Sequence, residues 1–316
     1  MISKRRAFIT GLKGPKLTFK ETNFLKKYRP WGIILFSRNI KTIYQTQQLT
    51  KKIRSIFKDK NYPILIDQEG GRVSRLNNFI DSSIFSAQFF GKLYLMNKEK
   101  FTIYYNVYIN QISYLLNTLG ININSVPVLD VYRKDSNKVI GNRSFSSNSR
   151  IVSIIGSLFI NKFHKNRIGT IVKHIPGHGL SRVDSHYKLP IVDKSLRELY
   201  KKDFKVFKNN KSIFSMTAHI VYKKIDFKYP ATHSKKVISL IRNKIKFKNL
   251  IITDDISMKS LKYSISENTK RAFTAGCNIV MHCSGNFNEM KDVAKNSPYI
   301  DKFILKNTYK FYNIVN

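Results

Sequence analysis

Three of the chain's seven histidines, His174, His178 and His186, lie within thirteen residues of one another. The same segment contains Asp184, and a proline with two glycines between His174 and Ser181 indicates an irregular loop. Histidine takes up and releases a proton near neutral pH, and a neighbouring carboxylate can orient the ring and tune its basicity. The spacing therefore predicts an Asp184–His186 pair that transfers protons.

The same loop has two other interpretations. His174, His178, Asp184 and His186 could supply ligands to a first-row transition metal, although their spacing matches no compact zinc signature and no cysteine is close in sequence. A tight turn with hydrogen-bonded histidines is the structural alternative. These residues alone leave all three interpretations open.

Two adjacent carboxylates, Asp254 and Asp255, follow a β-branched run in a chain that has only 19 acidic residues. Neighbouring residues of a strand point to opposite faces, so one of the two carboxylates can face a site while the other caps a helix or faces the outer shell. The pair predicts one functional carboxylate.

The segment Asp67 to Arg75 combines a carboxylate, paired glycines and two arginines after another apolar run. Such a set suits the binding of a polyhydroxylated ligand, and a turn with a surface salt bridge is the structural alternative. Arg143 lies in a second loop, Gly141 to Phe145, with the same two interpretations.

Short apolar runs that read as strands must position these side chains. Helical patterns separate the runs, with apolar residues on one face of 49–57, 101–116, 151–158 and 237–245, and Gly120 is expected to end the second. The runs cover residues 7–10, 32–36, 63–66, 126–129, 170–172, 213–216, 250–253 and 278–281.

Eight alternating units favour an α/β fold in which one domain, residues 1–316, forms a (β/α)₈ barrel. A doubly wound sheet is less favoured, because the first turn lacks the G-x-G-x-x-G spacing that binds a dinucleotide phosphate. Polar residues follow five of the runs and would meet at the carboxyl-terminal rim, where barrel enzymes build their active sites. They are Asp67, Asp130, Lys173-His174, His219 and Asp254.

The chain carries 57 Lys and Arg residues against 19 Asp and Glu residues, a formal net charge of +38. A charge of this size is typical of proteins that bind nucleic acid or an anionic surface. The basic residues, however, occur singly or in pairs along the whole chain, which favours a solvated surface. We therefore expect no specific nucleic-acid partner, and a basic binder built on an inactive barrel remains the alternative.

The only cysteines are Cys277 and Cys283, and no secretory signal or apolar stretch of about 20 residues is visible. These features predict a cytoplasmic protein with neither a disulfide framework nor a membrane span. The lack of a long heptad pattern favours a monomer.

The motifs resemble, in their order, those of a bacterial β-N-acetylhexosaminidase of glycoside hydrolase family 3, the single-domain cytoplasmic type used in cell-wall recycling. The resemblance covers nearly the whole chain. The segments that carry it are Trp31 to Asn39, Asp67 to Arg75, Val126 to Val131, Gly141 to Phe145, Lys173 to Gly179, Asp184 to His186, Met216 to His219, Thr253 to Met258 and Ala275 to Cys277.

The resemblance implies a retaining hydrolase in which Asp254 attacks the anomeric carbon and forms a covalent glycosyl-enzyme. His186 would act as the acid and base, with assistance from Asp184, where most retaining glycosidases use a second carboxylate. The implied reaction removes terminal β-linked N-acetylglucosamine from peptidoglycan fragments ending in anhydro-N-acetylmuramic acid.

The resemblance also implies a set of substrate contacts, and it implies no metal or organic cofactor. No cofactor is needed because the nucleophile and the proton shuttle suffice for the chemistry. A metal-dependent hydrolase that uses the histidine loop remains an alternative. The implied contacts to the N-acetylglucosamine ring are Asp67, Arg75, Arg143, Lys173 and His174.

Overall fold

The computed structural model describes residues 2–134, 139–181, 183–185 and 187–316. Within these ranges eight parallel strands close into a barrel in the order β1-β10-β9-β7-β5-β4-β3-β2, which confirms the predicted (β/α)₈ fold. The strands are β1 Arg6–Gly11, β2 Pro30–Leu35, β3 Ile64–Ile66, β4 Ile123–Asn124, β5 Gly169–Ile175, β7 Phe214–Thr217, β9 Leu250–Asp255 and β10 Ile279–His282. Two further short strands, β6 Ile191–Val192 and β8 Val221–Tyr222, pair outside the barrel.

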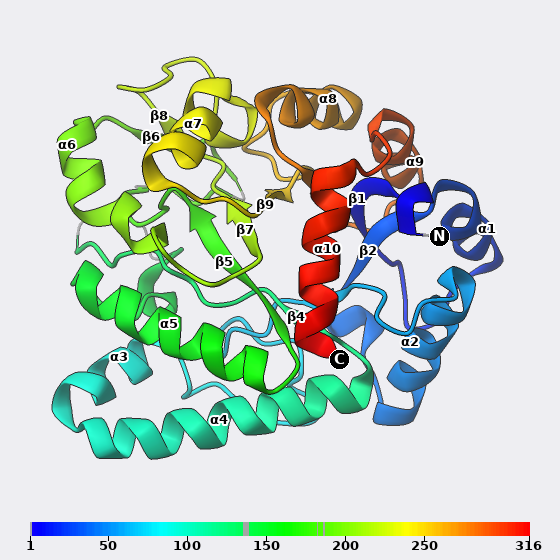
Figure 1. Cartoon of the computed structure of the whole chain (residues 1–316), viewed down its shortest axis with the longest axis horizontal. Helices are drawn as coiled ribbons and strands as arrows, with labels where there is room; N and C mark the ends of the chain where they lie inside the picture. Colours follow the sequence, from blue (N-terminus) through cyan, green and yellow to red (C-terminus); the bar gives the residue numbers. More distant parts are fainter. Residues whose placement is uncertain (1, 135–138, 182, 186) are drawn as a thin grey trace.

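Helices surround the barrel and alternate with its strands (Figure 1). Local sequence sets their ends: Thr18 and Glu21 form a capping box at the start of α1, and Gly120 ends α4 with φ 73°, as its position predicts. The helices are α1 Phe19–Tyr28, α2 Ile43–Phe57, α3 Ala87–Met96, α4 Lys98–Leu119, α5 Ser149–Lys165, α6 Leu196–Leu199, α7 Lys235–Leu240, α8 Ile265–Ala275, α9 Phe287–Asn296 and α10 Lys302–Val315.

Two hydrophobic layers hold the barrel together. One fills its interior and the other lies between the strands and the surrounding helices. Helix α10 runs across the barrel (Figure 1), where Trp31 Nε1 donates to Thr308 Oγ1 at 2.8 Å and Phe311 packs edge-on against Phe214. Because α10 covers the end at which the strands begin, the loops after the strands are left to form the site at the opposite end.

The fourth strand lies earlier in the chain than predicted. The sequence predicts a strand at 126–129, whereas β4 is Ile123–Asn124 and the later segment makes one isolated bridge, from Val128 to Lys173. Pro127 explains the difference, because proline has no backbone N–H to donate to a strand ladder.

Within the described residues, no helix combines the length and the apolar character that crossing a bilayer requires.

Candidate active site

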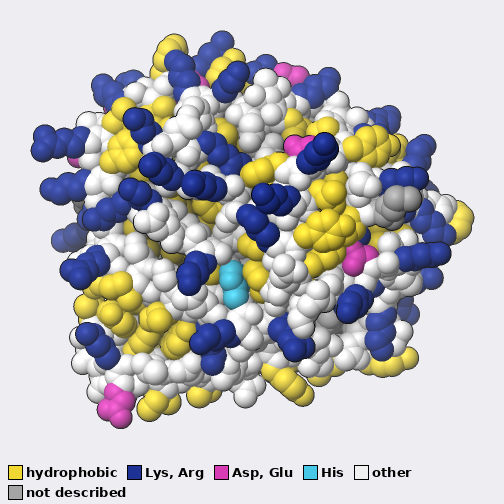
Figure 2. All heavy atoms as spheres, in the orientation of Figure 1, with side chains coloured by type: hydrophobic (Ala, Val, Ile, Leu, Met, Phe, Trp, Pro, Cys, Tyr) yellow, Lys and Arg dark blue, Asp and Glu magenta, His cyan; other side chains and the backbone are white. Residues whose placement is uncertain are grey.

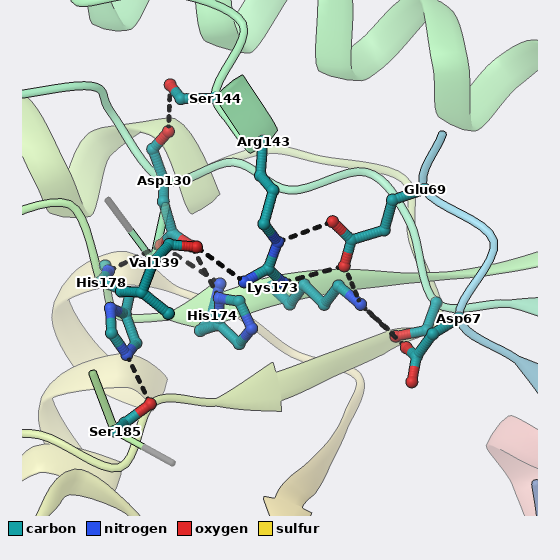
Figure 3. A network of polar contacts seen from close by, with 12 residues as sticks. Asp67, Glu69, Asp130, Val139, Arg143, Ser144, Lys173, His174, His178 and Ser185 are labelled. Atoms are coloured by element: carbon teal, nitrogen blue, oxygen red, sulfur yellow. Dashed lines mark hydrogen bonds and ion pairs between the residues drawn. The ribbon is translucent and has the colours of Figure 1, made fainter. Parts of the chain in front are cut away.

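Polar side chains from the ends of several strands meet at one end of the barrel (Figure 3). Asp67 and Glu69 follow β3, Lys173 and His174 lie at the end of β5, and Arg143 comes from the short helical turn Gly141–Arg143. Lys173 and Asp67, which are 106 positions apart in the chain, form an ion pair here. The barrel therefore builds the cluster that the strand-end positions predict.

Lys173 lies at the centre of the cluster. Its Nζ is 2.8 Å from Asp67 Oδ1, 2.7 Å from Glu69 Oε1 and 3.2 Å from Ser125 Oγ, and only 3 % of its side chain is exposed. Burial alone would lower the pKa of Lys173, but the carboxylates of Asp67 and Glu69 outweigh burial and raise it. Lys173 is therefore a fixed cation whose three N–H donors face Asp67, Glu69 and Ser125.

Glu69 joins two of the predicted substrate contacts. Its carboxylate accepts two hydrogen bonds of 2.8 Å, from Nε and Nη2 of Arg143, and it also contacts Lys173. Burial opposes ionisation, but Arg143 and Lys173 together hold the pKa of Glu69 well below its usual range. The paired cations are thereby held in one geometry.

Sequence reasoning did not single out Glu69. It stands two residues after Asp67 in a segment noted for its charged residues, and its role becomes visible only once Arg143 and Lys173 are brought beside it. The scarcity of acidic residues in this chain is the one signal that could have marked it.

Asp130 organises the histidines of the loop after β5. Its fully buried carboxylate lies 2.6 Å from His174 Nδ1 and accepts from the backbone N–H of His178, also at 2.6 Å. Burial opposes ionisation, but the histidine contacts lower the pKa of Asp130. Since an ionised carboxylate only accepts hydrogen bonds, His174 carries its proton on Nδ1, and its Nε2 lacks that proton when the ring is neutral.

The ring of His178 is enclosed. His178 Nε2 lies 3.0 Å from Ser185 Oγ, and burial followed by the nearby His174 lowers its pKa to about 4. This neutral, hydrogen-bonded ring matches the structural interpretation of the turn for His178. Within the described residues, no group of three or more potential metal-binding side chains comes together.

The two adjacent carboxylates at the end of β9 have different surroundings. Asp255 accepts from Ser257 N at 3.0 Å, Ser257 Oγ at 2.7 Å and Cys283 N at 3.1 Å, so it holds the turn after the strand. The backbone N–H of Asp255 in turn donates to Asp254 Oδ1 at 2.7 Å. Asp255 therefore has the structural role expected of one member of the pair.

Asp254 faces the same end of the barrel as Asp67. Burial raises the pKa of the Cys283 thiol, and the charges of Asp255, Asp67 and Asp254 raise it further. Burial lowers the pKa of His219 although the charge of Asp254 opposes the shift, and His219 Nε2 lies 3.0 Å from the Asp255 carbonyl oxygen. Asp254 is the member of the pair that the sequence predicts for chemistry, and it lies at the end of β9 beside the turn that Asp255 holds.

Two of the remaining predicted residues, Arg75 and Asp184, lie within the described part of the chain. The guanidinium of Arg75 lies 5.5 Å from the centre of the Phe36 ring, and its Nε is buried with no hydrogen-bond acceptor among the described atoms. Asp184 is half-buried and interacts electrostatically with Arg72. His186 lies outside the described residues.

Comparison with known proteins places the chain in one group. The family described as "Glycosyl hydrolase family 3 N terminal domain" matches residues 7–304. A beta-hexosaminidase of Haemophilus influenzae is 31% identical over 285 residues, which is 88% of this chain and 79% of that protein.

Solved structures agree with these sequence matches. Native NagZ from Neisseria gonorrhoeae superimposes with a TM-score of 0.87 at 28% identity, covering 98% of this chain and 90% of that one. Complexes of the same protein with N-trifluoroacetyl-D-glucosamine and with zinc ion match at 28% and 27% identity, with TM-scores of 0.84 and 0.83 and the same coverage.

Proposed function

The chain belongs to glycosyl hydrolase family 3 and is a β-N-acetylhexosaminidase, and from that premise we propose that it releases terminal β-linked N-acetylglucosamine from peptidoglycan fragments. The proposed fragments carry N-acetylglucosamine on anhydro-N-acetylmuramic acid, with or without a peptide. The likeness to a protein solved with an N-acylated glucosamine supports the sugar. The observation that carries the proposal is the cluster of Asp67, Arg143, Lys173 and His174, at the end of the barrel where β9 ends with Asp254 and Asp255.

The proposed mechanism proceeds in two displacements with net retention. Asp254 attacks the anomeric carbon as His186 donates a proton to the departing glycosidic oxygen, which forms a glycosyl-enzyme ester and breaks the bond to the leaving group. His186 then removes a proton from a water molecule, whose oxygen attacks the same carbon and releases the sugar and the Asp254 carboxylate. Asp184 orients His186 and stabilises its protonated form.

The ion-paired cluster would hold the sugar while these steps occur. Asp67, with 15% of its side chain exposed, is suited to accept hydrogen bonds from sugar hydroxyl groups. Lys173, Arg143 and Arg75 would supply donors, and His174 would present Nε2. Glu69 holds Lys173 and Arg143 in place, and Asp130 holds His174. These side chains therefore lose little conformational freedom when the substrate binds.

The mechanism calls for no metal or organic cofactor. We further propose that the protein acts as a monomer in the cytoplasm, where it would take part in cell-wall recycling.

Purified protein should hydrolyse a chromogenic N-acetyl-β-glucosaminide, and a chelator should leave the rate unchanged. The matching β-glucoside, which lacks the acetamido group, is the control and should react far more slowly. Turnover that a chelator abolishes would contradict the metal-free mechanism. The absence of turnover, together with tight and salt-sensitive DNA binding, would favour a nucleic-acid binder.

Replacement of His186 by alanine should slow hydrolysis in a way that depends on the leaving group. Aryl glycosides with acidic phenols need little proton donation, so their first displacement should slow far less than that of a disaccharide, where about 10²–10⁴-fold is expected. A series of substrates with graded leaving-group pKa measures this dependence. An equal loss across the series would show that His186 is not the acid.

A further inference from the structure

A cleft of about 980 Å³ lies outside the barrel beside the histidine loop. Its described lining includes Arg133 and Lys134 after β4, Leu180 in the loop, and residues of the segment around α6. We infer that this cleft binds the carboxylate groups of a peptide attached to the leaving-group sugar. The inference rests on the function proposed above, because it assumes a peptidoglycan fragment as the substrate.

The cleft adjoins the candidate active site. Leu180 is two residues after His178, and Arg133 is three residues after Asp130. Arg133 forms an ion pair with the buried Asp203, against which Gly177 packs so closely that an added Cβ would lie 3.0 Å from the Asp203 side chain. The loop after β5 therefore contains His174 and His178 and also contributes Leu180 to the lining of the cleft.

The basic groups of the cleft exceed its acidic groups. Lys194, Lys201, Lys202 and Lys205 join Arg133 and Lys134 around it. Figure 2 shows Lys and Arg side chains along the left edge of the molecule, where α6 lies in Figure 1. Two of these six cations are already paired, Arg133 with Asp203 and Lys194 with Glu198, and the positive charges that remain repel one another.

The acidic groups that line the cleft already have cationic partners. Glu198 lies 3.4 Å from Lys194, and Asp193 lies 3.1 Å from Lys223 and 3.7 Å from Lys224. Within the described residues, Lys201 and Lys205 have no such ion pair.

Crowding of like charges is also visible at Lys202. Burial lowers the pKa of Lys202, and the nearby Arg133 lowers it further, which is the expected result of holding two cations together. Asp203, which is paired with Arg133, offsets part of this repulsion, and a further carboxylate bound nearby would relieve more of it. The start of α5 contributes in the same sense, because Asn148 and Ser149 border the cleft at the helix end that favours anions.

A short peptide fits the size and the position of the cleft. Three extended residues span about 10 Å. Volumes of about 300–1,000 Å³ are typical of sites that enclose a small ligand. A peptide with acidic side chains and a free carboxyl end supplies several carboxylates, which matches several separate lysines better than one compact anion does.

The test compares two substrates on the intact protein: N-acetylglucosaminyl-anhydro-N-acetylmuramic acid with and without its acidic peptide. We expect the wild type to have a kcat/KM about three- to tenfold higher for the peptide-bearing substrate, in line with the small energies of exposed charge pairs. The preference should shrink as salt is added.

The variant carries Lys201→Glu and Lys205→Glu together, and its ratio of the two kcat/KM values should fall to one or below. The matched control carries Lys51→Glu and Lys52→Glu on the exposed face of α2. It makes the same change in net charge away from the cleft and should keep the wild-type ratio.

A wild type that cleaves both substrates equally, or a variant that keeps the wild-type ratio, would overturn the inference and leave the proposed function intact. Equal falls in the ratio for the variant and the control would also overturn it, because net charge alone would then explain the effect. Failure to cleave either substrate would instead refute the proposed function.

Discussion

Replacement of Asp254 by alanine should abolish hydrolysis of N-acetyl-β-glucosaminides, with kcat falling by about four orders of magnitude or more. That loss corresponds to about 5.5 kcal/mol of transition-state stabilisation and follows from removing the atom that attacks the anomeric carbon. Initial rates on a chromogenic substrate measure it. Addition of azide should restore part of the activity, because a small anion can occupy the space left by the carboxylate and attack the same carbon.

The neighbouring carboxylate provides the matched control. Asp255 accepts from Ser257 and Cys283 and holds the turn after β9, and asparagine keeps an oxygen that can accept in the same place. The Asp255→Asn variant should therefore retain turnover within about tenfold of the wild type, since its loss is about one hydrogen bond. If Asp255→Asn were inactive while Asp254→Ala kept substantial turnover, the assignment of the two residues would be reversed.

Replacement of Glu69 by alanine should lower the free energy of unfolding by about 3–5 kcal/mol. Glu69 has 6% of its side chain exposed and compensates both Arg143 and Lys173 at 2.7–2.8 Å. Without it Arg143 loses its bidentate partner, and Lys173 keeps only Asp67 as an ion-pair partner within the described residues. Chemical unfolding followed by fluorescence, at neutral pH, measures the loss.

A surface pair provides the control for this effect. Glu267 pairs with Arg271 at 2.7 Å along α8, but 39% of its side chain is exposed. Its replacement by alanine should cost no more than about 0.5 kcal/mol. Equal losses for the two variants would contradict the view that Glu69 stabilises a buried pair of cations.

Acid should remove the advantage that Glu69 provides. Its pKa is lowered in the folded protein, so its stabilising contribution is complete above the usual glutamate pKa of 4.5 and diminishes as pH falls below that value. The difference in the free energy of unfolding between the wild type and Glu69→Gln should therefore shrink as the pH falls below about 4.5. A difference that stayed constant over this range would show that Glu69 gains nothing from its ionised form.

The barrel could be predicted because its signal is repeated along the chain. Apolar runs alternate with amphipathic helices, and each run is short enough to be a buried strand. The prediction of a strand at 126–129 was wrong because a hydrophobic run indicates burial and does not by itself indicate strand pairing. Val126 and Leu129 are indeed buried, but Pro127 interrupts the ladder and the pairing strand is Ile123–Asn124.

The site could be predicted only in part, for a physical reason. Residues at strand ends, such as Asp67 and Lys173, share an edge of the barrel whatever the details of packing. The role of Glu69 as the shared partner of Arg143 and Lys173 depends on how the loop that contains Arg143 folds over the strand ends. The sequence does not specify that loop conformation. The distinction between Asp254 and Asp255 came from the family resemblance and not from the residues alone, and the contacts with Ser257 and Cys283 add that Asp255 holds the turn.

The most direct test of the account is to trap the glycosyl-enzyme. Incubation with a 5-fluoro analogue of N-acetylglucosaminyl fluoride should slow the second displacement more than the first, so that the protein gains the mass of one fluorinated sugar. Peptide mapping by mass spectrometry should then place that mass on Asp254. A label on another residue, or inverted product formed with no adduct, would contradict the account.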